Sequence, residues 1–209
     1  GVGPLGRVYI WDIVPAAKSA TAVCAAQAAA GAGNLTINGA SATAGVATFA
    51  DARAVNVDTS NIANTTQTIT VTGTDYYGQP QTEDIACNGT TLVAGKKAFK
   101  TVTGVYVDGA ITGTIQIGSE DTFGLPYRIT NAGYIVHAGW DGALADDIGT
   151  FVAADTTSPA TATTGDVRGT YTPSSAANGT RRLVMTLALT ALQAGPNATQ
   201  IAAIGVVPA

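Results

Sequence analysis

Few residues of this chain have the type and spacing needed for acid–base chemistry. His137 is the only histidine among the 209 residues, so a Ser-His-Asp or Cys-His arrangement would have to include it. It lies in the apolar run YIVHAGW, where we expect an ordinary packed or hydrogen-bonded side chain. The acidic pairs Glu83-Asp84 and Glu120-Asp121 are neighbours on strand-like segments, so the two members of each pair should point to opposite faces. We therefore predict no catalytic residue and no enzyme.

The sequence also gives little support for a metal or cofactor site. Asp146-Asp147 lies in a polar, Gly-bearing segment, but it lacks the alternating D-x-D-x-D spacing that supplies Ca²⁺ with several oxygens. Cys24 and Cys87 are too few and too far apart for a zinc knuckle or a disulfide framework. We interpret them as small buried apolar residues, and a bridge between them stays open. No P-loop or Rossmann fingerprint occurs, so we predict no metal and no cofactor.

Aromatic side chains are the other candidates for a binding site. Trp140 and the pair Tyr76-Tyr77 could stack on sugar rings, as aromatic residues do in carbohydrate-binding modules. The tyrosine pair precedes Gly78 at an expected hairpin tip, where packing within the turn explains it as well. We favour turn packing.

Composition excludes several classes of partner. Charged residues make up 11% of the chain and the formal net charge is −4, whereas nucleic-acid binding needs clustered Lys and Arg. No stretch approaches the roughly 20 apolar residues of a membrane helix. No basic region precedes a hydrophobic block near Gly1, so we expect no secretory signal. We predict no nucleic-acid partner and no membrane association.

The elements that position these residues are predicted to be strands. Residues 66–118 alternate apolar and polar side chains, with Gly-containing turns at short intervals, which is typical of half-buried antiparallel strands. The expected buried phase consists of Ile69, Val71, Ile85, Val102, Val105, Val107, Ile111, Ile115 and Ile117. The opposite phase is rich in Thr, which suits a pleated surface and carries little chemistry by itself.

The N-terminal third continues this pattern with one ambiguous segment. Val8–Trp11 has strong strand character, and the Gly/Pro-led residues before it form either an arm that reaches a neighbouring molecule or a frayed end. Residues 16–30 are rich in Ala, so a short helix and a strand are both open. Residues 34–57 alternate across an Asn38-Gly39 turn signal. There the expected inward residues are Leu35, Ile37, Val46, Thr48, Val55 and Val57.

Further strands are expected in the C-terminal half, at 134–138, 167–171, 182–190 and 201–207, with loops at 121–129 and 155–166. Short, regularly spaced strands without a long amphipathic helix predict an all-β protein, an antiparallel β-sandwich or jelly roll with an extended N-terminal arm. We expect residues 1–15 to form the arm and first strand, and residues 16–209 the sandwich domain. A composition shift near 118–125 marks a possible subdomain break.

Several segments resemble a structural protein family of tailed bacteriophages. They are NLTINGA at 34–40, GVATF at 45–49, the VTGTD…TEDI hairpin at 71–85 and the KAFKTVTGVYV strand pair at 97–107. FGLPYRI at 123–129 and DVRGTYTPSSAANGTRRL at 166–183 also look like segments of phage virion proteins.

The resemblance implies a capsid decoration (cement) protein, made in the host cytoplasm and bound to the outer surface of the virion head. Its partners would be the major capsid protein and itself, as a homotrimer. The alternative is another phage structural component, such as a head fibre, a tail part or a host-surface carbohydrate-binding module. From exposure alone, we expect capsid or partner contacts at Val2, Gly3, Pro4, Leu5, Arg7, Tyr76, Tyr77 and Gln79.

Overall fold

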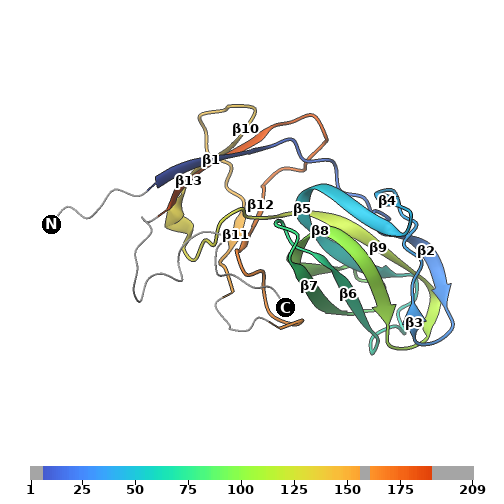
Figure 1. The fold of residues 1–209 in the computed structure, drawn as a ribbon. Coiled ribbons are helices and arrows are strands. Elements are labelled where there is room, and N and C mark those ends of the chain that lie inside the picture. The colour runs from blue at the N-terminus through green and yellow to red at the C-terminus, as the bar shows by residue number, and fades with distance from the viewer. Residues whose placement is uncertain (1–6, 156–160, 190–209) are drawn as a thin grey trace.

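The computed structural model describes residues 7–155 and 161–189, which form an all-β, antiparallel arrangement (Figure 1). The strands are β1 (Arg7–Ile13), β2 (Cys24–Ala29), β3 (Gly33–Asn34), β4 (Ala42–Thr43), β5 (Val46–Thr59), β6 (Thr68–Thr74), β7 (Pro80–Ala86), β8 (Val93–Val107), β9 (Ile111–Gly124), β10 (Ile135–Trp140), β11 (Thr150–Val152), β12 (Thr170–Thr172) and β13 (Leu183–Leu189). A 3₁₀ turn, η1 (Ala132–Tyr134), is the one helical element in these ranges, and no helix there is long and apolar enough to cross a membrane. The all-β prediction is confirmed; the jelly roll stays a prediction, and the arm lies outside the described residues.

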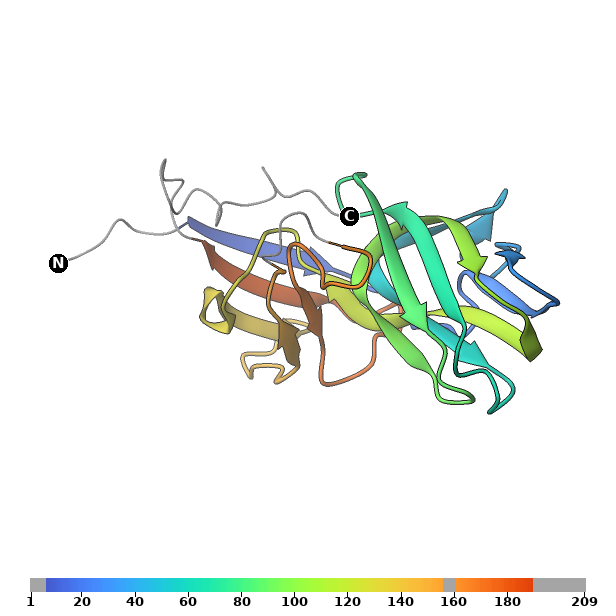
Figure 2. The same ribbon diagram turned by 90° about the horizontal axis from the view of Figure 1, so that it is seen from below.

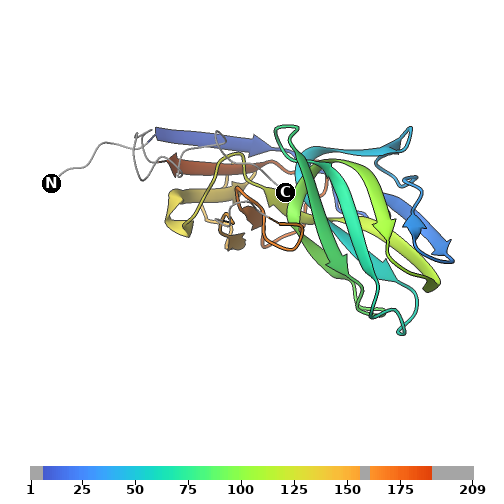
Figure 3. The same cartoon turned by 60° about the horizontal axis from the view of Figure 1, so that its bottom comes forward.

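Most strands belong to one curled sheet of order β11-β12-β9-β5-β8-β6-β7, with β2, β3 and β4 paired to β9, β8 and β5 off this path. The long strands β5, β8 and β9 lie side by side in this sheet, which curls as a whole (Figure 3). Register shifts interrupt their pairings, for example between Thr48 and Arg53 on β5. Because such bulges bend a strand and increase its twist, they let the sheet curl.

The larger core fills this curl and matches the predicted apolar phase. All nine residues expected to be buried between positions 69 and 117 are at most 7% exposed. They belong to a single hydrophobic cluster with residues from β2 and β5. The sequence predicted the burial of these residues correctly, because each strand keeps one face toward the core.

The predicted phase of β5 was wrong at its start. Val46 is half-buried and Thr48 is exposed, whereas Ala47 and Phe49 are buried. A tight turn at Ala44 and Gly45, both with positive φ, sets the register of the β4–β5 hairpin. The bulge that follows then shifts the phase, so that Val55 and Val57 point inward as expected.

The Ala-rich segment is a strand and not a helix. Residues Cys24–Ala29 form β2, which pairs with β9, and the Gln27 side-chain amide bonds both the N–H and the carbonyl of Thr36 at 3.0 and 2.9 Å. Tertiary pairing thus overrides the helix propensity of Ala. Cys24 and Cys87 are both free and buried, as interpreted, and burial raises the pKa of the Cys24 thiol to about 12.

A second, smaller sheet of order β1-β13-β10 lies beyond one end of the curled sheet (Figure 2). It covers a separate cluster of buried residues. That cluster contains Trp11, Ile13, Phe123, Leu125, Ile129, Ala138, Trp140, Tyr171, Ala177, Leu183, Met185, Leu187 and Leu189. Phe123 sits at the end of β9, so this strand runs from the first core into the second.

Buried ion pairs lie where the curled sheet adjoins the second hydrophobic cluster. The Arg53 guanidinium contacts the Asp121 carboxylate at 2.7 Å, and Arg168 pairs with Asp75; all four residues are at most 8% exposed. Arg53 and the residues on either side of it in β5 are buried. A buried guanidinium is stable only when carboxylate and carbonyl groups inside the protein accept its hydrogen bonds.

Candidate functional site

The small sheet exposes an apolar outer face. On β1 the side chains alternate, so Trp11 and Ile13 are buried while Val8 and Ile10 are 65% and 72% exposed. The registered partners on β13 are Ala188 opposite Val8 and Thr186 opposite Ile10, both half-buried. An ordinary one-sided sheet would carry polar residues at these outward positions.

A charged pair borders this outer face at one end. Arg182 donates to both carboxylate oxygens of Asp12, and its Nε lies 2.6 Å from Asp12 Oδ1. An apolar surface with a polar border is typical of a protein–protein contact. The sequence already carried the signal, because Val8–Trp11 is apolar at both phases of the strand.

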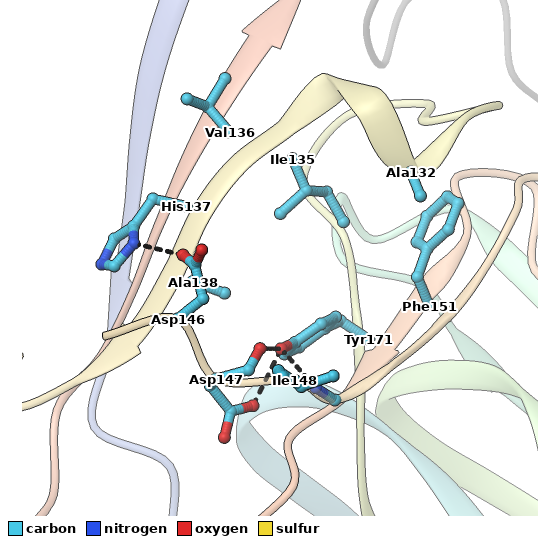
Figure 4. A pocket seen from close by; sticks show the side chains of 11 residues that line it. Ala132, Ile135, Val136, His137, Ala138, Asp146, Asp147, Ile148, Phe151 and Tyr171 are labelled. Carbon is cyan, nitrogen blue, oxygen red and sulfur yellow. Dashed lines mark hydrogen bonds and ion pairs between the residues drawn. The ribbon is translucent and has the colours of Figure 1, made fainter. Parts of the chain in front are cut away.

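A cavity of about 250 Å³ lies on the other side of β10 from β13, beneath the loop that joins β10 to β11 (Figure 4). Its walls are mostly apolar and include Ile135, Ile148 and the ring of Phe151. The polar feature at its mouth is a contact of 2.6 Å between His137 Nδ1 and Asp146 Oδ1. Both side chains reach solvent, at 31% and 65% exposure.

The loop over the cavity is held in place by Asp147. The Tyr171 hydroxyl lies 2.7 Å from the Asp147 carbonyl and 2.8 Å from its Oδ2, and Ser174 donates its N–H to the same carboxylate at 3.0 Å. Burial and the hydrogen bond to Asp147 raise the pKa of the Tyr171 hydroxyl, so it stays a donor. The outer part of the loop keeps large apolar side chains in solvent, with Leu144 98% and Ile148 88% exposed.

These groups do not form a catalytic triad. His137 is hydrogen-bonded, as expected, and its carboxylate partner Asp146 could orient it. The nearby hydroxyl of Ser174 bonds Asp147 and not His137. Sequence reasoning missed the Asp147–Tyr171–Ser174 contacts, because the three residues come from separate segments.

The described residues contain no group of three or more His, Cys, Asp or Glu side chains that could hold a metal ion. The carboxylates of Asp146 and Asp147 serve different partners, His137 for the first and Tyr171 with Ser174 for the second. The two acidic pairs on strands also diverge. Glu83 is buried and Asp84 bonds the Thr70 hydroxyl, whereas Asp121 is buried and Glu120 contacts Lys18.

The predicted hairpin tip exists between β6 and β7, but its tyrosines are largely engaged. Tyr77 is 46% exposed, yet its hydroxyl donates to the Pro126 carbonyl at 2.6 Å, and the Arg168 guanidinium lies 5.1 Å from its ring centre. The Asp75 carboxylate accepts the N–H groups of Tyr77 and Gln79 at 2.9 and 2.8 Å. Tyr76 is half-buried against Tyr77, and Gln79 is exposed. This is the turn packing that we favoured.

The remaining candidates are the N-terminal residues, which can be placed only in part, and Trp140. Val2, Gly3, Pro4 and Leu5 lie outside the described residues, whereas Arg7 begins β1 and pairs with Leu189. Trp140 is 6% exposed and the Arg181 guanidinium covers its ring at 4.3 Å. Its ring face is therefore not available for stacking on a sugar.

Comparison with protein-family models, with characterised proteins and with solved structures found no match to this chain.

Proposed function

We propose that this protein is a capsid decoration (cement) protein of a tailed bacteriophage. It belongs on the outer surface of the virion head, with the major capsid protein and further copies of itself, as a homotrimer, for partners. The observation that carries the proposal is the exposed apolar face of β1, with Val8 and Ile10 directed to solvent. The phage-like segments and the sparse charge of 11% support it.

The mechanism is thermodynamic. A protein that binds only the assembled shell stabilises that shell by mass action, by an amount set by its concentration relative to its dissociation constant. Several copies joined in one oligomer bind a repeating lattice more tightly than one copy does, because later contacts form at high effective concentration. Covering the outer face removes apolar side chains from water, which supplies the free energy of docking.

The experiment mixes purified protein with heads that lack it, and measures co-sedimentation and the melting temperature of the heads. We expect wild-type protein to bind and to raise that temperature. Ile10→Asp should weaken binding about tenfold or more, because it places a charge in the apolar contact. Ile62→Asp is the matched control, since Ile62 is 78% exposed in a loop after β5.

Two results would contradict the proposal in different ways. If wild-type protein neither binds heads nor stabilises them, the decoration function is wrong. If Ile10→Asp and Ile62→Asp weaken binding equally, the outer face is not the contact.

The cavity favours a second candidate, a host-surface carbohydrate-binding module. A half-buried aromatic ring, Phe151, and an exposed His137–Asp146 pair line one opening, and sugars are bound by such mixed apolar and hydrogen-bonding surfaces. Glycan-array binding that Asp146→Ala abolishes and Ile10→Asp leaves unchanged would favour this function over decoration.

A further inference from the structure

A lysine and two carboxylic acids that line neither the cavity nor the outer face of the small sheet are buried close together. Lys97 on β8 is 0% exposed, Glu83 on β7 is 2% exposed, and Asp166 in the segment before β12 is 4% exposed. Lys97 is among the largest fully buried side chains of the described residues. A buried lysine is costly unless its surroundings compensate the charge or remove it.

A bulge in β8 brings the two acids to this lysine. Ala98 pairs with Ala54, and Ala94 pairs with Asn56. The chain therefore advances four residues on β8 where it advances two on β5, and the extra residues form the bulge. The backbone N–H groups within and beside the bulge are taken up by side chains. Glu83 accepts from Lys96 N–H and, at 3.2 Å, from Lys97 N–H.

Asp166 approaches the same stretch of backbone. Its Oδ2 accepts the N–H of Ala98 at 3.0 Å, and its Oδ1 accepts that of Arg168 at 2.9 Å. Both carboxyl groups are thus anchored at residues 96–98 by backbone donors. Gly95 permits the approach of Glu83, because a Cβ there would lie 2.7 Å from Glu83 Oε2.

The electrostatics of the cluster favour uncharged forms. Burial lowers the pKa of the Lys97 amine, and the charges that oppose this are, in decreasing order, those of Glu83, Asp166, Asp155 and Asp84. Burial raises the pKa of Glu83 to about 7 and raises that of Asp166 as well. A neutral amine is a nucleophile, and a protonated carboxyl group can lose water, so these are the forms that amide formation requires.

We propose that Lys97 and Asp166 condense to an intramolecular isopeptide bond, with Glu83 as the group that transfers the proton. The lone pair of Lys97 Nζ attacks Cγ of Asp166 and forms a C–N bond. Protonated Glu83 gives its proton to the departing hydroxyl of Asp166 and accepts one from Nζ in its place, so one C–O bond breaks, one water leaves and Glu83 ends protonated. Nothing is oxidised or reduced, and no co-reactant is needed.

The bond would remove a lysine–carboxylate pair from the interior and tie the segment before β12 to the curled sheet. It closes a long loop between residues 97 and 166, and such a covalent link restricts the unfolded chain as a disulfide does. This inference does not depend on what the protein binds.

The test is the intact mass of the full chain, purified and then denatured. We expect a mass about 18 Da below that of the sequence, the loss of one water, and a branched peptide joining Lys97 to Asp166 after digestion. Lys97→Met and Glu83→Gln should each restore the full mass. Lys96→Met is the matched control, because Lys96 is exposed beside Lys97, and it should keep the loss.

Further readouts separate this bond from other causes of water loss. Asp166→Asn should lose ammonia, about 17 Da, in place of water and form the same bond. Lys97→Met should melt about 10 °C lower than wild type. A folded wild-type protein with the full sequence mass overturns the proposal. So does water loss confined to Asp166, which indicates a cyclic imide, or a link from Lys97 to Glu83.

Discussion

The Arg53–Asp121 ion pair allows a quantitative test of how the two parts of the fold are joined. Arg53 Nη2 lies 2.7 Å from Asp121 Oδ1, and the two side chains are 4% and 11% exposed. Arg53 also donates to the carbonyls of Glu120 and Ala16 at 2.7 and 2.9 Å. Burial lowers the pKa of the guanidinium despite these partners, but an arginine side chain stays charged, so the carboxylate compensates a buried positive charge.

Asp121→Ala should lower the free energy of unfolding by about 3–5 kcal/mol, because it leaves a buried charge without its counter-ion. The substitution also removes the acceptor of the Ala177 N–H, which lies 3.1 Å from Asp121 Oδ2. The double variant Arg53→Met with Asp121→Leu should cost less than Asp121→Ala alone. No uncompensated charge remains in it, and apolar replacements of a buried pair are often tolerated.

Urea unfolding followed by circular dichroism measures these differences. Lys18→Ala is the control, since it breaks an ion pair with Glu120 in which Lys18 is 56% exposed, and it should cost less than about 1 kcal/mol. The reasoning is refuted if Asp121→Ala costs no more than Lys18→Ala, or if the double variant is the least stable of the three.

Three further predictions concern single sites. Glu83, with a pKa near 7 against 4.5, binds its proton more tightly when folded. Its contribution to the free energy of unfolding is therefore complete below pH 4.5 and is lost as pH rises through 7, a loss of about 3 kcal/mol. Urea unfolding of Glu83→Gln at a series of pH values should lack this part of the pH dependence. Gly73→Ala should lower the free energy of unfolding in urea by about 1–3 kcal/mol, because its Cβ would lie 1.9 Å from the Thr101 carbonyl oxygen. Gly104→Ala is the control and should be near neutral, because a Cβ there would make only ordinary contacts. Tyr171→Phe removes the hydroxyl that donates to Asp147 and accepts the Gly149 N–H. We therefore expect faster proteolysis of the 141–149 loop, at a cost of about 1–3 kcal/mol; unchanged cleavage would contradict the role of Asp147.

The strands with one buried face could be predicted residue by residue. Between positions 69 and 117 a two-residue period placed the apolar side chains in the core, as observed. The start of β5 could not be predicted in this way, since a turn at Ala44-Gly45 and a later bulge shift the phase. Bulges depend on the partner strand, so periodicity within one strand does not reveal them.

The candidate sites also differ in how much of each could be predicted from the sequence. The sequence by itself determined the all-β class, the burial of both cysteines and the apolar strand Val8–Trp11, because these follow from side-chain type and local period. Only the tertiary structure decided that Val8 and Ile10 face solvent, that Asp147 meets Tyr171, and that Lys97 lies with Glu83 and Asp166. Each of those contacts joins segments far apart in the chain, and the free energy that forms them comes from packing and desolvation that no local pattern encodes.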